Sequence, residues 1–189
     1  FSGASSLKII LELKTNTDRP FISVQNISSM FQDVNFNNIQ NKNNIKLWNV
    51  SSVTDMSGMF YNATNFNKDI SSWNVSNVTD MSFMFDGATS FNQDIERWNV
   101  SSVTNMTLMF NNAIAFNQPI ENWNVSNVRK MESMFSGASL FNQDIETWNV
   151  SNVNTMEGMF ARASSFNKNI RYWSTKDEVY LEGMFYQAS

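Results

Sequence analysis

The sequence repeats itself every 25 residues over most of its 189-residue length, and this period constrains the fold more than any other feature. Columns of Met, Phe and Ala, which include Met59, Phe60 and Ala63, recur at this step. Tryptophan marks the same step at Trp48, Trp73, Trp98, Trp123, Trp148 and Trp173. The unit reads W-N-V-S-x-V-x-x-M-x-x-M-F-x-x-A-x-x-F-N-x-x-I-x-x. A single unit is too small to bury its apolar side chains, so we expect successive units to stack.

Apolar spacing inside the unit predicts two short elements. From Met56 to Ala63 the apolar residues follow the i, i+3, i+4, i+7 spacing of one helix face. Trp73 and Val75 alternate with a polar residue, which is typical of a short strand, and strands of successive turns would pair in parallel. We therefore predict an α/β repeat, a leucine-rich-repeat-like solenoid with one short parallel strand and one short helix per 25-residue turn.

The regularity of the repeat divides the chain into three parts of one solenoid. Residues 1–47 are degenerate N-terminal repeats with insertions at 14–20 and 37–44, and residues 48–172 are five regular repeats. Residues 173–189 form an atypical, truncated C-terminal repeat in which Ser174 to Val179 replace the usual motif. Because the chain opens and stops in mid-unit, we expect it to be a fragment of a longer protein.

Composition argues against several classes of function. The chain has no His and no Cys, which removes Ser-His-Asp and Cys-His nucleophilic sites and nearly all zinc sites. Its net charge of -4 does not suit a phosphate-binding surface, which is basic. No stretch approaches the ~20 apolar residues of a membrane span. We expect no enzyme, no catalytic residue, no cofactor and no nucleic-acid partner, and membrane contact only through an anchor outside this fragment.

The block W-N-V-S-x-V-T-D-M-S-x-M-F-x-x-A-x-x-F-N-x-D-I resembles the 25/26-residue repeat of bacterial surface proteins. This family was formerly a domain of unknown function in Mollicute and Listeria lipoproteins, and it is similar to BspA-type leucine-rich repeats. The resemblance is strong from Trp48 to Ala188 and weak before it. It implies a secreted or cell-surface protein that acts in adhesion or recognition, and it brings no catalytic residues.

The two residues before each Trp vary between otherwise similar units. By analogy with leucine-rich repeats, these pairs would lie on the outer side of the strand face, where variable side chains determine which partner is bound. The predicted interaction strip comprises Ser72, Glu96, Arg97, Glu121, Asn122, Glu146, Thr147 and Tyr172. The alternative is that these are ordinary solvated residues, since variable exposed positions are common on any surface.

Other recurrent polar residues have structural interpretations. An Asn follows the second Phe of each unit, and we predict an inward ladder that satisfies buried backbone groups, formed by Asn67, Asn92, Asn117, Asn142 and Asn167. Candidate glycosylation sequons outside the W-N-V-S element include Asn26, Asn62 and Asn105. Glu96, Glu121 and Glu146 form a like-charge column near Asp94 and Asp144, but Pro119 interrupts the Asp column and we predict no metal site.

The repeat pattern and the composition leave two functional hypotheses open. The first is an extracellular or cell-surface protein that binds a protein or glycan partner through the strip. The second is a structural or assembly subunit of a surface complex, filament or layer, whose partners are copies of itself or other subunits. Low charge and a repetitive surface suit regular packing, and a variable strip suits recognition.

Overall fold

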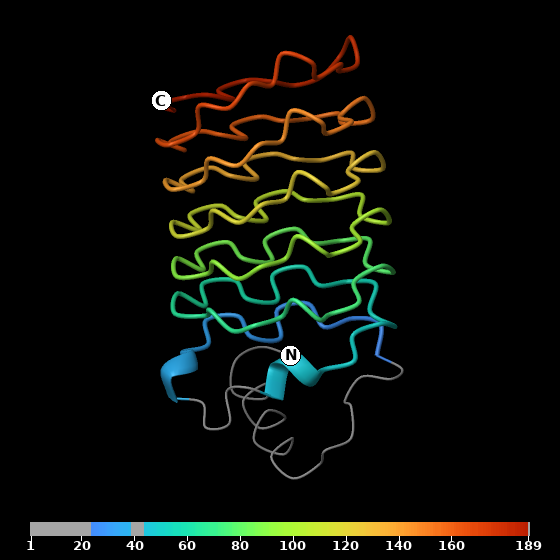
Figure 1. Cartoon of the computed structure of the whole chain (residues 1–189), viewed down its shortest axis with the longest axis vertical. Coiled ribbons are helices and arrows are strands. Elements are labelled where there is room, and N and C mark those ends of the chain that lie inside the picture. Colours follow the sequence, from blue (N-terminus) through green and yellow to red (C-terminus); the bar gives the residue numbers. More distant parts are fainter. Residues whose placement is uncertain (1–23, 39–43, 189) are drawn as a thin grey trace.

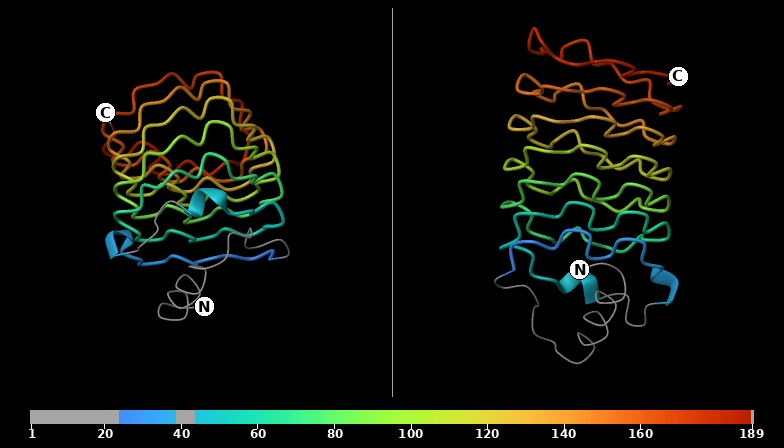
Figure 2. Two further views of the ribbon diagram at one scale, coloured as in Figure 1. Left: turned by 60° about the horizontal axis from the view of Figure 1, so that its bottom comes forward. Right: turned by 180° about the vertical axis from the view of Figure 1, so that it is seen from behind.

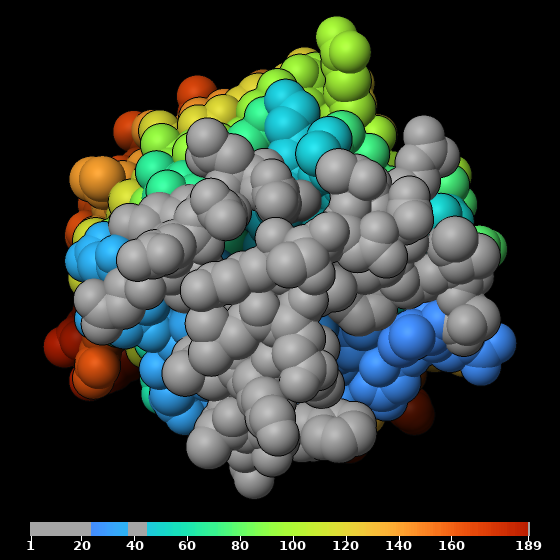
Figure 3. Space-filling model, turned by 90° about the horizontal axis from the view of Figure 1, so that it is seen from below, coloured from blue at the N-terminus to red at the C-terminus, as the bar shows by residue number. Residues whose placement is uncertain are grey.

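The computed structural model describes residues 24–38 and 44–188. The chain winds into a stack of flattened coils, each lying on the one before it (Figures 1 and 2). Seen along the stack from its N-terminal end, later coils show only at the rim (Figure 3). Two 3-10 helices, η1 (Phe36–Asn38) and η2 (Asn44–Leu47), precede the first Trp, and the described residues contain no other helix and no strand.

The predicted helix and the predicted strand of each unit are both wrong. In the segment from Met56 to Ala63, the N–H groups of Met59, Tyr61 and Ala63 donate to carbonyls three residues back. The alternate N–H groups, from Met56 to Asn62, donate instead to carbonyls of the next coil at 2.7–3.0 Å. An α-helix needs every N–H to bond four residues back within its own segment. The segment is therefore a run of overlapping turns, 56–59, 58–61 and 60–63.

A left-handed residue every fourth position explains why no helix forms. Gly58 and Asn62 have φ of 60° and 54°, and a positive φ at the third residue of a turn is the mark of type II geometry. The same two positions recur along the stack at Ser29, Asp33, Phe83, Gly87, Leu108, Asn112, Ser133, Gly137, Gly158, Arg162, Gly183 and Gln187. A right-handed helix does not continue through such residues. A four-residue turn period places the same i, i+3, i+4, i+7 residues on one face.

The W-N-V segment makes turns as well. The N–H of Trp73 donates to the carbonyl of Ile70 at 3.1 Å, and that of Val78 to Val75 at 2.9 Å. Parallel pairing between coils occurs elsewhere in the unit, as single bridges through the column Asn26, Asp55, Asp80, Asn105, Lys130, Thr155 and Tyr180. A single bridged residue per coil is too short to be a strand, so no sheet face forms in the described part of the chain.

The predicted apolar columns form the core. Met59, Phe60 and Ala63 are fully buried, as are their counterparts in the next four coils. Phenylalanines stack along the axis, with 5.5 Å between the ring centroids of Phe60 and Phe85. Within one coil, Phe60 lies 3.8 Å from Phe66. Burial of these side chains requires a neighbouring coil on each side, so the stack is stabilised mainly by contacts between coils.

The division of the chain into three parts stays a prediction. The insertion at 14–20, together with all of residues 1–23, lies outside the described residues, as do residues 39–43 of the second insertion. Within the described part, no helix is long and apolar enough to span a bilayer.

Candidate interaction surface

The pair before each Trp occupies the centre of a tight turn. Because the Trp73 N–H bonds to the Ile70 carbonyl, Ser71 and Ser72 are the two central residues of that turn. The same bond recurs at 3.1 Å from Trp98 to Ile95 and from Trp123 to Ile120. The predicted strip is thus a column of turn tips rather than a row of strand residues.

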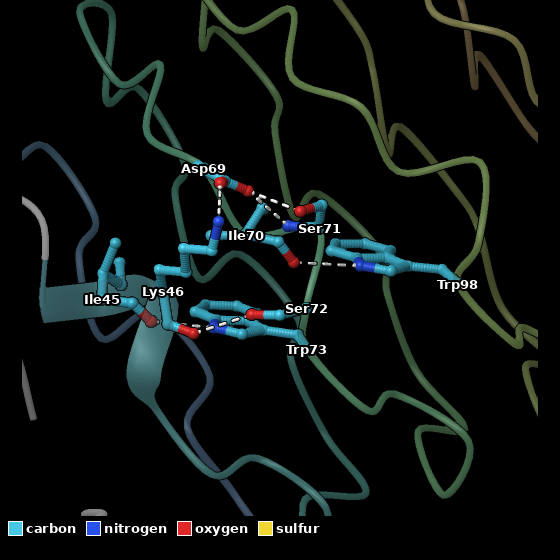
Figure 4. Close-up of polar contacts among 8 residues, drawn as sticks. All are labelled: Ile45, Lys46, Asp69, Ile70, Ser71, Ser72, Trp73 and Trp98. Atoms are coloured by element: carbon cyan, nitrogen blue, oxygen red, sulfur yellow. Dashed lines mark hydrogen bonds and ion pairs between the residues drawn. The ribbon is translucent and has the colours of Figure 1, made fainter.

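In most pairs, the backbone N–H of the first residue donates a hydrogen bond to an Asp or Asn side chain two residues earlier in the sequence. Asp69 Oδ1 accepts hydrogen bonds from the Ser71 N–H at 3.0 Å and from its hydroxyl at 2.6 Å (Figure 4). Asp94 does the same for the N–H of Glu96 at 3.0 Å. This local bonding fixes the turn without using the variable side chains.

The second member of a pair reaches toward the preceding coil. Ser72 Oγ donates to the Lys46 carbonyl at 2.8 Å (Figure 4), and Asn122 Nδ2 donates to Glu96 Oε1 at 3.0 Å. Thr147 Oγ1 donates to the carbonyl of Glu121 at 3.2 Å. These contacts order the strip, so its side chains are presented in defined positions.

Two strip residues keep unused hydrogen-bonding capacity. Arg97 is exposed, and within the described part of the chain its guanidinium has no hydrogen bond or ion pair. Glu146 Oε1 is buried and has no hydrogen-bond partner in the structure. At the C-terminal end, Arg171 lies over the ring of Tyr172, 4.4 Å from its centroid, and Tyr172 is 65% exposed. The exposed Arg97 cation and the Tyr172 ring are therefore available along one column.

An ion pair between Lys46 and Asp69 lies at the N-terminal end of the column. Lys46 Nζ lies 2.6 Å from Asp69 Oδ2 (Figure 4). The Lys46 hydrogen bond, and after it those from Ser71, lower the pKa of Asp69 to about 2. Among the described residues, no group of three or more acidic side chains is arranged to hold a metal ion.

The Asn ladder lies at the surface and joins coils rather than filling the interior. Asn67 Oδ1 accepts the backbone N–H of Asn92 at 3.0 Å, and Asn92 Oδ1 accepts that of Asn117 at 2.9 Å. Gln93 Nε2 donates to the same Asn67 oxygen at 2.8 Å. Asn67 and Asn167 are exposed and Asn92, Asn117 and Asn142 are half-buried, so the amides bridge adjacent backbones where solvent reaches them.

Two of the three candidate sequons, Asn26 and Asn105, already use their side chains in hydrogen bonds between coils. Asn26 Nδ2 donates to Asp55 Oδ2 at 2.8 Å, and Asn105 Nδ2 donates to Asp80 Oδ2 at 3.1 Å. Asn62 is exposed and lies beneath Gly87 of the next coil. A glycan is attached through Nδ2. Modification of Asn26 or Asn105 would therefore place a glycan on a nitrogen that already bonds to the neighbouring coil.

The sequence analysis did not identify Asp86, a buried acidic residue in the turn segment that is equivalent to residues 56–63. Asp86 is only 8% exposed, and its Oδ1 accepts a hydrogen bond from Asn111 Nδ2 at 2.8 Å. Burial raises the pKa of Asp86 above its ordinary value, with the Asn111 hydrogen bond opposing the shift. Its counterparts in other units are Tyr61, Asn111, Ser136, Ala161 and Tyr186, so no column pattern signals this position.

Stacked coils of one recurring unit define a repeat protein. The chain belongs to the family described as Mycoplasma protein of unknown function, DUF285, whose model matches residues 25–139 and again residues 118–189. This membership supports the repeat-family part of the predicted resemblance to Mollicute proteins. No curated protein and no solved structure matches the chain.

Proposed function

We propose that this chain is a non-enzymatic, secreted or cell-surface protein that binds a protein or glycan partner through the column of turn tips before each Trp. The proposal rests on the contrast, within this column, between a backbone that is the same in successive coils and side chains that differ. The backbone is held by the same bonds in successive coils, while the exposed side chains change from Ser72 to Arg97, Asn122, Thr147 and Tyr172.

The chemistry of the column suits recognition of a polar partner. Arg97 offers an exposed cation that has no partner among the described residues, and Tyr172 offers an exposed ring. Aromatic and Arg side chains dominate binding energy at interfaces.

The relationship to BspA-like surface proteins is part of this proposal. Family membership and the W-N-V-S, M-F and F-N elements support it, and it favours an extracellular or cell-surface location. The proposal does not carry over a leucine-rich-repeat sheet, because the turn tips occupy the place that a strand face was expected to fill. The absence of His and Cys supports a role without catalysis.

A triple variant tests the column. Arg97→Ala, Glu121→Ala and Thr147→Ala together should weaken binding to a responsive probe, identified on a glycan array and a panel of extracellular-matrix proteins. The matched control replaces an exposed Arg, Glu and Thr outside the column with Ala, at Arg129, Glu157 and Thr104. We expect at least about a tenfold loss of affinity for the first variant and little change for the second. Equal affinity of the two variants would reject the column as the binding surface.

A second candidate function is an assembly subunit. The observation that favours it is the repetitive surface of low charge, with 16% charged residues, which suits regular packing against other subunits. Sedimentation velocity separates the candidates: a concentration-dependent assembly of the full chain supports the second, and a monomer at all concentrations supports the first.

A further inference from the structure

Two large apolar residues occupy left-handed positions in the turn segments. Phe83 and Leu108 have φ of 58° and 57°, and their equivalents in the coils on either side are Gly58 and Ser133. A left-handed backbone is unfavourable for a residue with a Cβ, and a bulky side chain makes it rarer still. Phe83 is 39% exposed and Leu108 is partly exposed, so neither side chain belongs to the buried core. Backbone strain persists in folded proteins mainly where it serves a function, and here it displays apolar side chains at the surface.

The two residues are neighbours in the stack. The Phe83 N–H donates to the Thr107 carbonyl of the next coil at 2.9 Å, so Leu108 lies beside Phe83 in the same column. They form an exposed apolar pair on the outer side of the turn segments. We call this side the turn face, and it comprises the outward side chains of segments 26–33, 55–62, 80–87, 105–112, 130–137 and 155–162.

Opposite charges flank the apolar pair at matched positions along the stack. In the bridge column, Asp55 lies one coil before the pair and Lys130 lies one coil after it. One coil farther out on each side, Asp33 and Arg162 occupy another shared column, and each has φ of 59°. Asp33, Lys130 and Arg162 are exposed, and within the described part of the chain the Lys130 ammonium has no hydrogen bond or ion pair. The two acids thus lie on one side of the pair, and the two bases lie on the other.

This pattern is complementary to itself when a second copy is turned over. A two-fold axis that runs along the coil direction, between the two coils of the apolar pair, lays one turn face on another with the stacks antiparallel. Each residue then faces its own column in the partner, counted from the opposite end. The facing pairs are Phe83 with the partner's Leu108, Asp55 with the partner's Lys130, and Asp33 with the partner's Arg162. Because such a contact is isologous, each of these pairs occurs twice.

The other charged positions of the described turn face meet neutral residues in this arrangement. They are Asp80 against the partner's Asn105, Asp86 against the partner's Asn111, Glu132 against the partner's Ser57, and Glu157 against the partner's Ser28. No carboxylate of the described turn face therefore opposes another carboxylate. Like charges across an interface would cost affinity, so their absence favours self-association through this surface.

The charges also select one register. With the axis moved to the coil of Phe83, Asp55 would face the partner's Asn105 and Asp33 would face the partner's Gly137. With the axis moved to the coil of Leu108, Asp55 would face the partner's Thr155. Of these three registers, the one centred between Phe83 and Leu108 sets both Asp33 and Asp55 against bases.

We propose that the turn face is a dimerisation surface, on which a second copy of this chain binds in the antiparallel register centred between Phe83 and Leu108. The apolar pair supplies the buried centre of the contact, and the ion pairs toward its edges set register and orientation. A two-fold contact uses the same surface on both copies, so association stops at two. The turn-tip column lies outside the turn face, and the inference does not rest on the proposed function.

Sedimentation velocity of the full chain, from micromolar to millimolar concentration, tests the dimer. We expect a monomer–dimer equilibrium. The double variant Phe83→Ser and Leu108→Ser should weaken the dimer by about tenfold or more, and it should stay folded because Ser133 occupies the same column with φ of 50°. The matched control is Ile114→Ser with Leu140→Ser, an apolar pair on neighbouring coils outside the turn face, 46% and 53% exposed. A chain that stays monomeric throughout, or equal affinity of the two variants, would overturn the proposal.

A charge swap tests the antiparallel register. Asp33→Arg alone sets a second guanidinium against the partner's Arg162, twice in each dimer, and should weaken the dimer by about threefold or more at low salt. Adding Arg162→Asp exchanges the two charges and should restore the affinity. Both positions are exposed and have the same φ of 59°, so each residue fits at the other's position. An unchanged dimer with Asp33→Arg, or no recovery with the double variant, would contradict the register and with it the proposal.

The dimer is distinct from the second candidate function, in which association continues into a complex, filament or layer. Association that persists in the Phe83→Ser and Leu108→Ser variant belongs to that assembly, and association that this variant abolishes belongs to the dimer. The sedimentation comparison of the two candidate functions is therefore made with this variant. The Arg97, Glu121 and Thr147 triple variant should dimerise as the unsubstituted chain does.

Discussion

The indole Nε1 of Trp98 donates a hydrogen bond to the backbone carbonyl of Ile70 in the preceding coil, at 3.2 Å (Figure 4). The same carbonyl also accepts the N–H of Trp73, at 3.1 Å. The Ile70 carbonyl thus closes a turn within its own coil and also accepts the hydrogen bond of the Trp98 side chain from the next coil. Because Trp73 makes the equivalent bond to Ile45 at 2.9 Å, the indole column links coil to coil along the stack (Figure 4).

Replacement of Trp98 by Phe should destabilise the fold by roughly 1–3 kcal/mol. The substitution removes a buried hydrogen bond and leaves part of the indole volume empty. The matched variant is Trp173→Phe, whose indole makes the same bond at 3.0 Å but is only half-buried in the last coil. Urea unfolding followed by circular dichroism should show a smaller loss at Trp173. An equal loss at both positions would contradict a dependence on burial between coils.

Replacement of Gly87 by Ala should cost roughly 2–4 kcal/mol of stability. A Cβ at this position would lie 2.4 Å from Asn62 Oδ1, and Gly87 has φ of +71°. The double variant with Asn62→Gly removes the collision and should recover the part of the loss that comes from it. Only the cost of the left-handed backbone then remains. A double-mutant cycle measures the coupling, and strictly additive losses would show that Asn62 is not the obstacle.

Replacement of Arg162 by Gly should stabilise the protein by about 0.5–1 kcal/mol. Arg162 is exposed with φ of 59°, a conformation that costs an L-residue with a Cβ about 1 kcal/mol or more. The greater freedom of glycine in the unfolded chain offsets part of this gain. Arg162→Ala keeps the Cβ and loses the same exposed bond to Gln187, so it should give no gain. Thermal melting compares the two, and equal stability of the Gly and Ala variants would refute the strain argument.

Asp86→Asn should raise stability at neutral pH. Burial raises the pKa of Asp86 in the folded state, so the folded protein binds this proton more tightly than the unfolded chain. Protonated Asp86 therefore stabilises the fold below its unfolded pKa, and this contribution is lost as pH rises through the folded pKa. The advantage of the Asp86→Asn variant over the unsubstituted chain should be present near pH 7 and vanish near pH 3. Denaturant unfolding at several pH values measures it.

Asp69→Asn is the control with the opposite sign. The pKa of Asp69 is lowered to about 2, first by the Lys46 hydrogen bond and then by Ser71. Its contribution is present above the unfolded pKa of 3.8 and is lost as pH falls toward about 2. The exposed pair is screened by solvent, so the loss on substitution should stay under about 1 kcal/mol at neutral pH. Stability differences of the same sign for both variants would contradict these assignments.

The candidate surface was only partly readable from the sequence. Comparison of units within the chain singles out the pairs that include Arg97 and Tyr172, because constrained columns stand out from variable ones. The turn geometry of these pairs could not be predicted from the sequence, because it depends on the hydrogen bond from each Trp N–H to the Ile carbonyl. Asp86 carries no sequence signal, because its burial arises from neighbours in adjacent coils.

The sequence by itself determined the period, the stacking and the identity of the buried columns, such as Met59, Phe60 and Ala63. These follow from apolar spacing, which is a property of the unit alone. Only the tertiary structure decided how the backbone runs between those columns. A helix and a run of overlapping turns place the same residues inward, and the choice depends on where the alternate N–H groups bond. In this protein they bond to carbonyls of the next coil, as from Phe60 to Met84 at 2.9 Å. Those acceptors exist only once the coils have stacked.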